Sequence, residues 1–233
     1  NGLETLEKIM CIQPTPVLML SAVTTKGAQA TMRALELGAV DFVAKPEKRL
    51  DIGLLANELP IKVKMAAGVA VSKVCRARKV EPIISQPPQF YRPPDLIPSR
   101  KNKIEVVAIG TSTGGPAALN TLLRTVPADL PVGVLVAQHM PPGFTTSLAQ
   151  RLNDLGRMPV KEAQDGDLIE PGKAFLAPAG WQMEAIREAD KVRVRIAKES
   201  PIETLFKPSV DVLFLSVAKA FGGNSLGVVM TGM

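Results

Sequence analysis

The sequence predicts an α/β protein with two parallel-sheet domains and a linker between them. Apolar strand-length segments alternate with helix-length segments on both sides of a proline-rich stretch, and this alternation is typical of parallel sheets. Residues 81–100 contain six prolines and little periodic hydrophobicity, a composition typical of an extended connector. We therefore expect a first domain over residues 1–78, a linker over residues 79–103 and a second domain over residues 104–233.

The elements of the first domain follow the order helix, strand, helix, strand, helix. Its two predicted strands are short apolar runs, and its three predicted helices are longer segments between and around them. The helices are expected at residues 2–10, 27–37 and 51–74, and the strands at 16–21 and 40–44.

The second domain repeats the alternation and adds a hairpin. Residues 182–186 and 192–196 flank a charged turn and alternate in polarity like two antiparallel strands. Ser209 is a plausible N-cap for a helix that stops at Gly222 and Gly223. The expected strands are 106–109, 132–138, 174–177 and 226–230, and the expected helices are 116–124, 144–155 and 210–221. The prediction is a doubly wound α/β domain that carries a β-hairpin.

Composition and charge exclude several classes of protein. The longest apolar stretches are far shorter than the roughly 20 residues of a membrane span, and no secretory signal is recognisable, so we expect a cytoplasmic location. Cys11 and Cys75 fall in separate predicted helices and are expected to be free, buried thiols.

The net charge of +6 is concentrated before the second domain. Residues 62–103 hold most of the excess, but Phe90 and Tyr91 are the only aromatics there to stack on bases, which argues against nucleic-acid binding. A solvated linker or a contact with an acidic protein surface fits better.

Residues 104–115 run an apolar strand directly into a serine flanked by glycines. Gly110-Thr111-Ser112-Thr113-Gly114 fits the pattern Gly-x-Ser-x-Gly in the setting that this pattern requires, a strand followed by a sharp turn and a helix. Such a turn presents the serine hydroxyl, and the start of the helix offers free N–H groups to an oxyanion, with the Thr113 N–H as the natural first donor.

Other interpretations use the same glycines. A Walker-type phosphate loop would need lysine where Pro116 stands. A dinucleotide fingerprint would need glycine where Ser112 stands. A simple anion site at the helix start, or a purely structural turn, stays open.

The single histidine of the chain, His139, comes 27 residues after Ser112 and directly after the strand predicted at 132–138. Strands joined by one helix are often neighbours, so His139 and Ser112 are expected at one edge of the sheet. An acid that orients the imidazole should come later in the chain, but none of the four candidates is compelling: they are Asp165, Asp167, Asp190 and Asp211.

Four motifs in order resemble the chemotaxis protein-glutamate methylesterase family. They are Ile-Gly-Thr-Ser-Thr-Gly-Gly (109–115), Gln-His-Met-Pro-Pro-Gly-Phe (138–144), Pro-Ser-Val-Asp-Val-Leu-Phe (208–214) and Met-Thr-Gly-Met (230–233). The resemblance implies a receiver (flavodoxin-like) domain, of which residues 1–78 match the second half, joined to a doubly wound catalytic domain.

The resemblance implies roles for several residues. Ser112 corresponds to the nucleophile and His139 to the base, while the backbone N–H groups of Thr113 and Met233 correspond to the oxyanion hole. Ser21 and Lys45 correspond to the receiver switch residues. No residue of the sequence matches the triad aspartate or the phosphate-accepting aspartate, so we expect the chain as printed to be impaired.

The activity implied is hydrolysis of glutamate γ-methyl esters, and deamidation of some glutamines, on the cytoplasmic part of chemoreceptors. The expected partners are those receptors and a chemotaxis histidine kinase, which would phosphorylate the receiver in two-component signalling; the protein is expected to be monomeric. No metal or cofactor is expected for catalysis, and Mg²⁺ only for phosphorylation of a complete receiver. Two alternatives remain: a non-catalytic response-regulator output module, and a phosphate-ligand binder that uses the loop from Gly110 to Gly115.

Overall fold

The computed structural model describes residues 1–46, 52–70 and 103–232. Cys75, Met233 and the linker predicted over 79–103, apart from its last residue, lie outside the described residues. None of the helices in the described ranges is long and apolar enough to cross a membrane.

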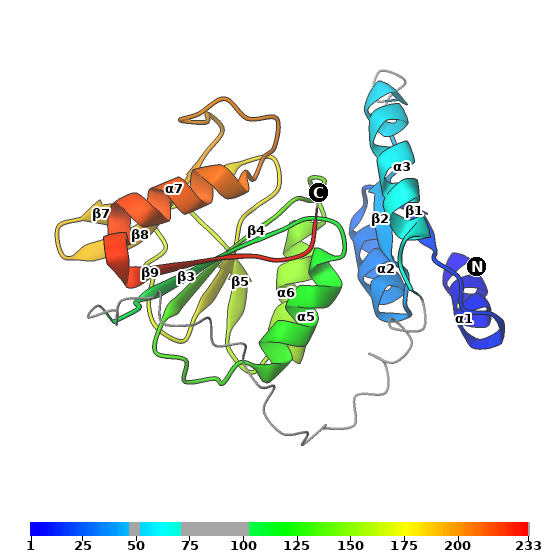
Figure 1. The fold of residues 1–233 in the computed structure, drawn as a ribbon, viewed down its shortest axis with the longest axis horizontal. Helices are drawn as coiled ribbons and strands as arrows, with labels where there is room; N and C mark the ends of the chain where they lie inside the picture. Colours follow the sequence, from blue (N-terminus) through cyan, green and yellow to red (C-terminus); the bar gives the residue numbers. More distant parts are fainter. Residues whose placement is uncertain (47–51, 71–102, 233) are drawn as a thin grey trace, which may run out of the picture.

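The N-terminal half is a two-stranded parallel sheet with three helices (Figure 1). Its elements are α1 (Gly2–Ile12), β1 (Leu18–Ser21), α2 (Thr25–Glu36), β2 (Asp41–Ala44) and α3 (Ile52–Ala67). Thr24 caps α2, because its side chain accepts a hydrogen bond from the Gly27 N–H. The helix predicted at 51–74 ends earlier, at Ala67, where Gly68 closes the last turn onto Met65.

The C-terminal half contains a five-stranded parallel sheet in the order β5-β6-β4-β3-β9, together with an antiparallel hairpin of β7 and β8. The strands are β3 (Val106–Thr111), β4 (Gly133–Gln138), β5 (Val160–Glu162), β6 (Ala174–Leu176), β7 (Gln182–Glu188), β8 (Lys191–Ala197) and β9 (Ser225–Val229). The helices are α5 (Gly115–Thr125), α6 (Thr145–Leu155) and α7 (Val210–Phe221).

The sheet is covered on both faces, as a doubly wound fold requires. Alternate residues of β4 enter different cores: Val134 and Val136 pack with α5 and α6, whereas Leu135 packs with α7 and the hairpin. Figure 1 shows these two layers, α5 and α6 on one side of the sheet and α7 with the hairpin on the other. The fold class predicted from the sequence is confirmed.

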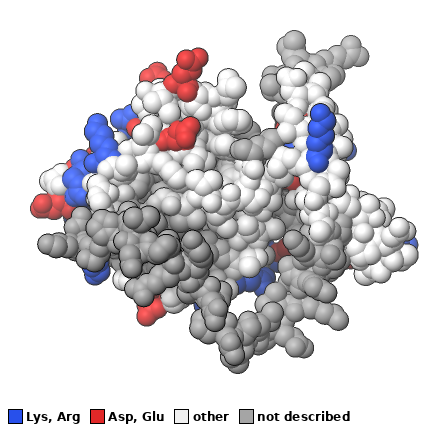
Figure 2. Space-filling view, in the orientation of Figure 1, with Lys and Arg blue, Asp and Glu red and all other residues white. Residues whose placement is uncertain are grey.

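Charged side chains gather at the hairpin end of the molecule, where both signs are interspersed (Figure 2). Arg193 pairs with Glu188 and Arg195 pairs with Glu184 along the hairpin. On the face that Figure 2 shows, positive and negative side chains at this end therefore lie beside one another.

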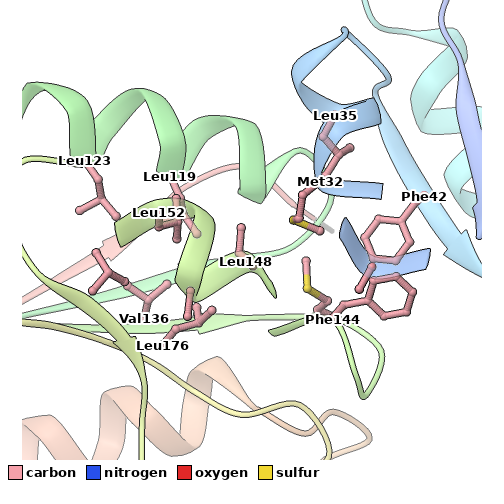
Figure 3. Packing of buried hydrophobic residues seen from close by; sticks show 14 of the residues in the cluster. Met32, Leu35, Phe42, Leu119, Leu123, Val136, Phe144, Leu148, Leu152 and Leu176 are labelled. Carbon is pink, nitrogen blue, oxygen red and sulfur yellow. The ribbon is translucent and has the colours of Figure 1, made fainter. Parts of the chain in front are cut away.

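The two halves share one hydrophobic cluster. The ring of Phe42 in β2 lies 4.6 Å from that of Phe144, which directly precedes α6. Figure 3 shows Met32 and Leu35 of α2 beside this pair. At the rim of the contact, Arg151 of α6 forms an ion pair with Glu36 of α2. Helix α2 is thereby held against the segment that follows β4, the segment that begins with His139.

Cys11 is exposed, which corrects the prediction of a buried thiol. The residue before it, Met10, faces the core of the N-terminal half together with Leu6. Since successive helical residues are rotated by about 100°, Cys11 faces outward.

Candidate active site

Strands β3 and β4 bring Ser112 and His139 to the same edge of the sheet. The two strands pair in parallel, with Thr111 opposite Gln138 at their last position, so Ser112 and His139 are the next residues on each. The His139 N–H donates to the Thr111 carbonyl at 3.0 Å. Both side chains line one cavity of ≈ 360 Å³, at the carboxyl ends of the strands where open α/β sheets bind ligands.

The serine turn is fixed by the segment after β9. The Ser112 N–H donates to the Thr231 carbonyl at 2.9 Å, and the Thr231 hydroxyl donates to the Thr113 carbonyl at 3.0 Å. A Cβ built on Gly232 would lie 2.6 Å from the Ser112 Cβ, so only glycine fits there. Gly114, the N-cap of α5, has φ +75° and turns the chain from the serine into the helix.

Gln138 connects the serine turn to the histidine. It is fully buried, and its Nε2 donates to the carbonyls of both Ser112 (2.8 Å) and His139 (2.9 Å). Its Oε1 accepts a hydrogen bond from the Thr111 hydroxyl at 2.6 Å. The space for this side chain exists because Gly115 has none: a Cβ there would lie 1.9 Å from Gln138 Oε1.

The His139 imidazole is half-buried and stacks on the ring of Phe206, with ring centroids 4.4 Å apart and planes inclined by 12°. Its Nε2 is buried and has no hydrogen-bond partner among the described residues. Burial lowers the pKa of His139 below its ordinary value, and the Asp211 carboxylate opposes this by raising it. A neutral imidazole is the form that can take a proton from a serine hydroxyl.

Thr113 directly precedes Gly114, the N-cap of α5, and its N–H donates to no acceptor in the parts of the chain that the structure describes. The N-terminal end of a helix is electropositive, so this N–H is suited to bind an oxyanion. Met233, the other predicted donor, lies outside the described residues.

Among the described residues that line the cavity, Asp211 is the one carboxylate; it lies in the first turn of α7. The other three acid candidates do not line the cavity. Asp165 accepts a hydrogen bond from the Ile196 N–H, and Asp167 accepts one from the Gln164 N–H and forms an ion pair with Lys161. Asp190 lies in the turn between β7 and β8, and Asp165 also lies in a turn.

Ser21 and Lys45 lie together in the N-terminal half and do not line the cavity. The Ser21 hydroxyl donates to the Gly27 carbonyl and accepts from the Thr31 hydroxyl. The Lys45 N–H donates to the Ser21 carbonyl at 2.6 Å. Their predicted function as switch residues remains a prediction.

Gln138 and Phe206 are not among the site residues that the sequence predicts. A buried amide at the end of an otherwise apolar strand was a usable signal for Gln138, because buried polar groups are normally hydrogen-bonded. Phe206 comes 67 residues after His139, and no local sequence pattern predicts that the two rings are in contact. Among the described residues no group of three or more His, Cys, Asp or Glu side chains could hold a metal ion.

Comparison with known proteins agrees with this architecture. The family model for CheB methylesterase matches residues 107–233. Two curated relatives match the whole chain, at 44% identity in Desulfitobacterium hafniense and 43% in Archaeoglobus fulgidus, and both bear the name protein-glutamate methylesterase/protein-glutamine glutaminase. The chain spans 68% and 65% of their lengths.

A solved structure supports the fold of the C-terminal half. The crystal structure of the Thermotoga maritima CheB methylesterase catalytic domain is 36% identical in sequence, with a TM-score of 0.54 over 56% of this chain and 69% of that one. The family match over more than half of the chain, together with relatives over its full length, shows that the chain belongs to the CheB methylesterase family.

Proposed function

We propose that this chain hydrolyses γ-methyl esters of glutamate side chains in a protein substrate and deamidates glutamine side chains. The names of its relatives describe both reactions. The observation that carries the proposal is the placement of a serine and the chain's single histidine on adjacent strand ends in one cavity. The two alternatives are an output module without catalysis and a phosphate binder. Neither explains why the relatives are named as esterases or why the His139 imidazole lies beside Ser112 in the cavity.

The reaction begins when Ser112 Oγ attacks the ester carbonyl and His139 takes its proton. The imidazole then protonates the departing methanol, or ammonia from a glutamine, and an acyl-enzyme remains. His139 next activates a water that releases the free glutamate. The N–H groups of Thr113 and Met233 hold the tetrahedral oxygen. The reaction requires no metal or organic cofactor, and Mg²⁺ would serve only the phosphorylation of a complete receiver.

The substrate and partners of the proposed enzyme follow from the resemblance. Methylated glutamates on the cytoplasmic part of chemoreceptors are the proposed substrate, and a chemotaxis histidine kinase is the proposed phosphoryl donor. The protein would act as a monomer in the cytoplasm.

Regulation is proposed to act through the segment after His139. A Cβ built on Gly143 would lie 3.2 Å from Val23 Cγ1, and Phe42 packs on Phe144, so the N-terminal half contacts this segment directly. All described residues that line the cavity belong to the C-terminal half. The contact supports a proposal that a change in the receiver alters catalysis by moving the 140–144 segment and His139.

Methanol release from a methylated receptor tests the proposal, in the 233-residue chain and in a version extended to the length of its relatives. Ser112→Ala and His139→Ala should each abolish release, since a triad acts as a unit, while Ser147→Ala on α6 should leave the rate unchanged. A serine-directed phosphonate should label Ser112. Retained methanol release in either active-site variant would reject the assignment.

A further inference from the structure

The loop between β8 and α7 places an aromatic ring on the candidate base. Phe206 is 52% exposed, yet its ring lies nearly parallel to the His139 imidazole at 4.4 Å. The backbone around Phe206 is hydrogen-bonded: the Phe206 N–H donates to the Thr204 hydroxyl at 3.2 Å, the Phe206 carbonyl accepts from Gln182 Nε2 at 2.9 Å, and the Lys207 carbonyl accepts from the Gly180 N–H at 2.9 Å. With the backbone held, only the side-chain torsions of Phe206 remain free to move the ring away from the imidazole.

This contact has two consequences for the imidazole. The Phe206 ring selects one orientation of the imidazole plane. It also removes water from one face of the imidazole, which adds to the burial of Nε2. Two effects on the protonation of His139 then compete. Loss of hydration disfavours the cation, whereas the electron-rich face of an aromatic ring attracts it. Burial is the main cause that lowers the pKa of His139, and the stacked ring contributes to that burial, so we expect the loss of hydration to be the larger effect.

We propose that Phe206 is a positioning residue, whose ring fixes the plane of the His139 imidazole and shields one of its faces from water. The role is separate from the chemistry, because a phenyl ring neither donates nor accepts a proton. It makes the base rigid and keeps it in the neutral form that proton abstraction requires.

The charged groups around His139 must be considered with this contact. Asp211 on α7 is the one charged side chain besides His139 that lines the cavity among the described residues. Its effect on the His139 pKa is opposite in sign to that of burial. Lys207 follows Phe206 in the chain, but its ammonium group is bound to the Lys198 carbonyl. Removal of the phenyl ring therefore weakens the burial that lowers the pKa of His139 and leaves the opposing effect of the Asp211 carboxylate in place.

The chain allows a direct test because it contains a single histidine. Its imidazole C–H protons can be followed by NMR through a pH titration of the intact chain without assignment. Phe206→Ala should raise the pKa of His139 and move its C–H resonances downfield, since the shielding of the stacked ring is lost. Phe206→Tyr should preserve both, and Phe206→Leu should preserve part of the pKa effect but none of the ring shielding.

Leu205→Ala is the matched control. Leu205 is the neighbouring residue in the same loop and is 97% exposed, so its truncation should leave the titration of His139 unchanged. Because Phe206 is half-exposed, its truncation should not unfold the chain, and the far-UV spectrum checks this. Unchanged resonances and an unchanged pKa in Phe206→Ala would overturn the proposal, as would a fall in the pKa, which would mean that the ring mainly attracts the cation.

A second readout rests on the proposed function. In an active form of the enzyme, Phe206→Ala should lower kcat at neutral pH by about tenfold, since misplacement of a catalytic group by about an ångström costs up to roughly a hundredfold. The acid limb of the pH profile of kcat/KM should move to higher pH, and Phe206→Tyr should restore both. If His139→Ala abolishes methanol release but Phe206→Ala changes neither the rate nor the pH profile, the positioning role fails and the proposed function stands. If His139→Ala retains methanol release, the proposed function itself fails.

Discussion

The active site depends on a single buried amide as much as on its reactive groups. Gln138 holds the carbonyls on both sides of the cavity, those of Ser112 and His139, through one Nε2. A buried carbonyl that loses its donor costs about 1–3 kcal/mol. The side chain therefore sets the distance between the two turns as well as their stability.

Gln138→Leu tests this role by keeping the approximate volume while removing every hydrogen bond. We expect the free energy of unfolding to fall by about 2–4 kcal/mol, because two carbonyls and the Thr111 hydroxyl lose their partner. Esterase kcat should fall with it, because both turns are released. Gln150→Leu on the exposed face of α6, where the amide bonds only Asp154, should change stability by less than about 0.5 kcal/mol. Equal urea midpoints for the two variants would contradict the prediction.

The protonation of His139 should respond to Asp211. A carboxylate stabilises the imidazolium and so raises the pKa of His139; its removal must lower that pKa. Since the neutral imidazole is the active form, the rate falls as the pH drops through the pKa, and Asp211→Asn should move this acid limb of kcat/KM to lower pH. Asp211 is exposed, so the shift should be small and should shrink as salt screens the carboxylate.

Asp190→Asn in the hairpin turn supplies the control for that pH profile. Asp190 is also exposed but does not line the cavity, so its neutralisation should leave the acid limb in place. An acid limb that moves to higher pH in Asp211→Asn would show that the carboxylate acts through structure rather than through its charge.

Among the elements, α7 approaches β3 closely because one strand residue has no side chain. A Cβ built on Gly110 would lie 2.4 Å from Val210 Cγ1 and 2.9 Å from Val210 Cγ2. Gly110 thus lets the first turn of α7, which carries Asp211, pack directly beside the serine turn.

Gly110→Ala should destabilise the chain by about 1–3 kcal/mol, as overpacking does, and should reduce activity by displacing α7. Val210→Ala removes both methyl groups that the new Cβ would meet, so the double variant should recover stability relative to the sum of the single changes. Gly53→Ala in α3, where nothing lies within 4 Å, should be neutral or stabilising by up to about 1 kcal/mol. Additive losses in the Gly110 and Val210 cycle, measured by urea unfolding, would disprove a direct clash.

The elements show what local sequence can predict. β3, β4, α5, α6 and α7 were predicted within a few residues because each has the apolar period of its type and a clear boundary: Ser209, for example, caps α7 as expected. β5 was missed. It has three residues, and Val160 is its one apolar side chain, so it carries no period; its pairing with β6 makes it a strand.

Part of the active site could also be predicted from the sequence. Ser112 and His139 follow strands that could be recognised and that are consecutive, so their meeting at one sheet edge could be expected from topology. The contact of Phe206 with His139 could not be expected, and Asp211 could not be distinguished from the other three acid candidates. Both depend on how a loop and a helix that come 67 and 72 residues after His139 fold back over the cavity. Such contacts are set by tertiary packing and leave no mark on the local pattern.

At the scale of the molecule, the N-terminal and C-terminal halves are joined by a core rather than by surface contacts. One continuous hydrophobic cluster contains Phe42 and Met32 from the first half and Phe144 and Leu148 from the second. The ion pair of Glu36 with Arg151 lies at its partly exposed edge and is expected to contribute at most about 1 kcal/mol. The apolar contact is therefore what couples the two halves.

The fluorescence of the single tryptophan of the chain, Trp181, can be used to measure this coupling. It lies in the C-terminal half beside Lys198, so its fluorescence follows the unfolding of that half. Phe42→Ala, in the other half, should lower the stability reported by Trp181 by about 3 kcal/mol or more, since a buried phenylalanine costs about 3–5 kcal/mol to truncate.

Ile61→Ala is the control, because Ile61 is 46% exposed on α3 and does not belong to the shared cluster; it should leave the Trp181 midpoint nearly unchanged. If Phe42→Ala also left that midpoint in place while a probe of the N-terminal half moved, the halves would unfold independently, and a regulatory signal could not pass through Phe144 to His139.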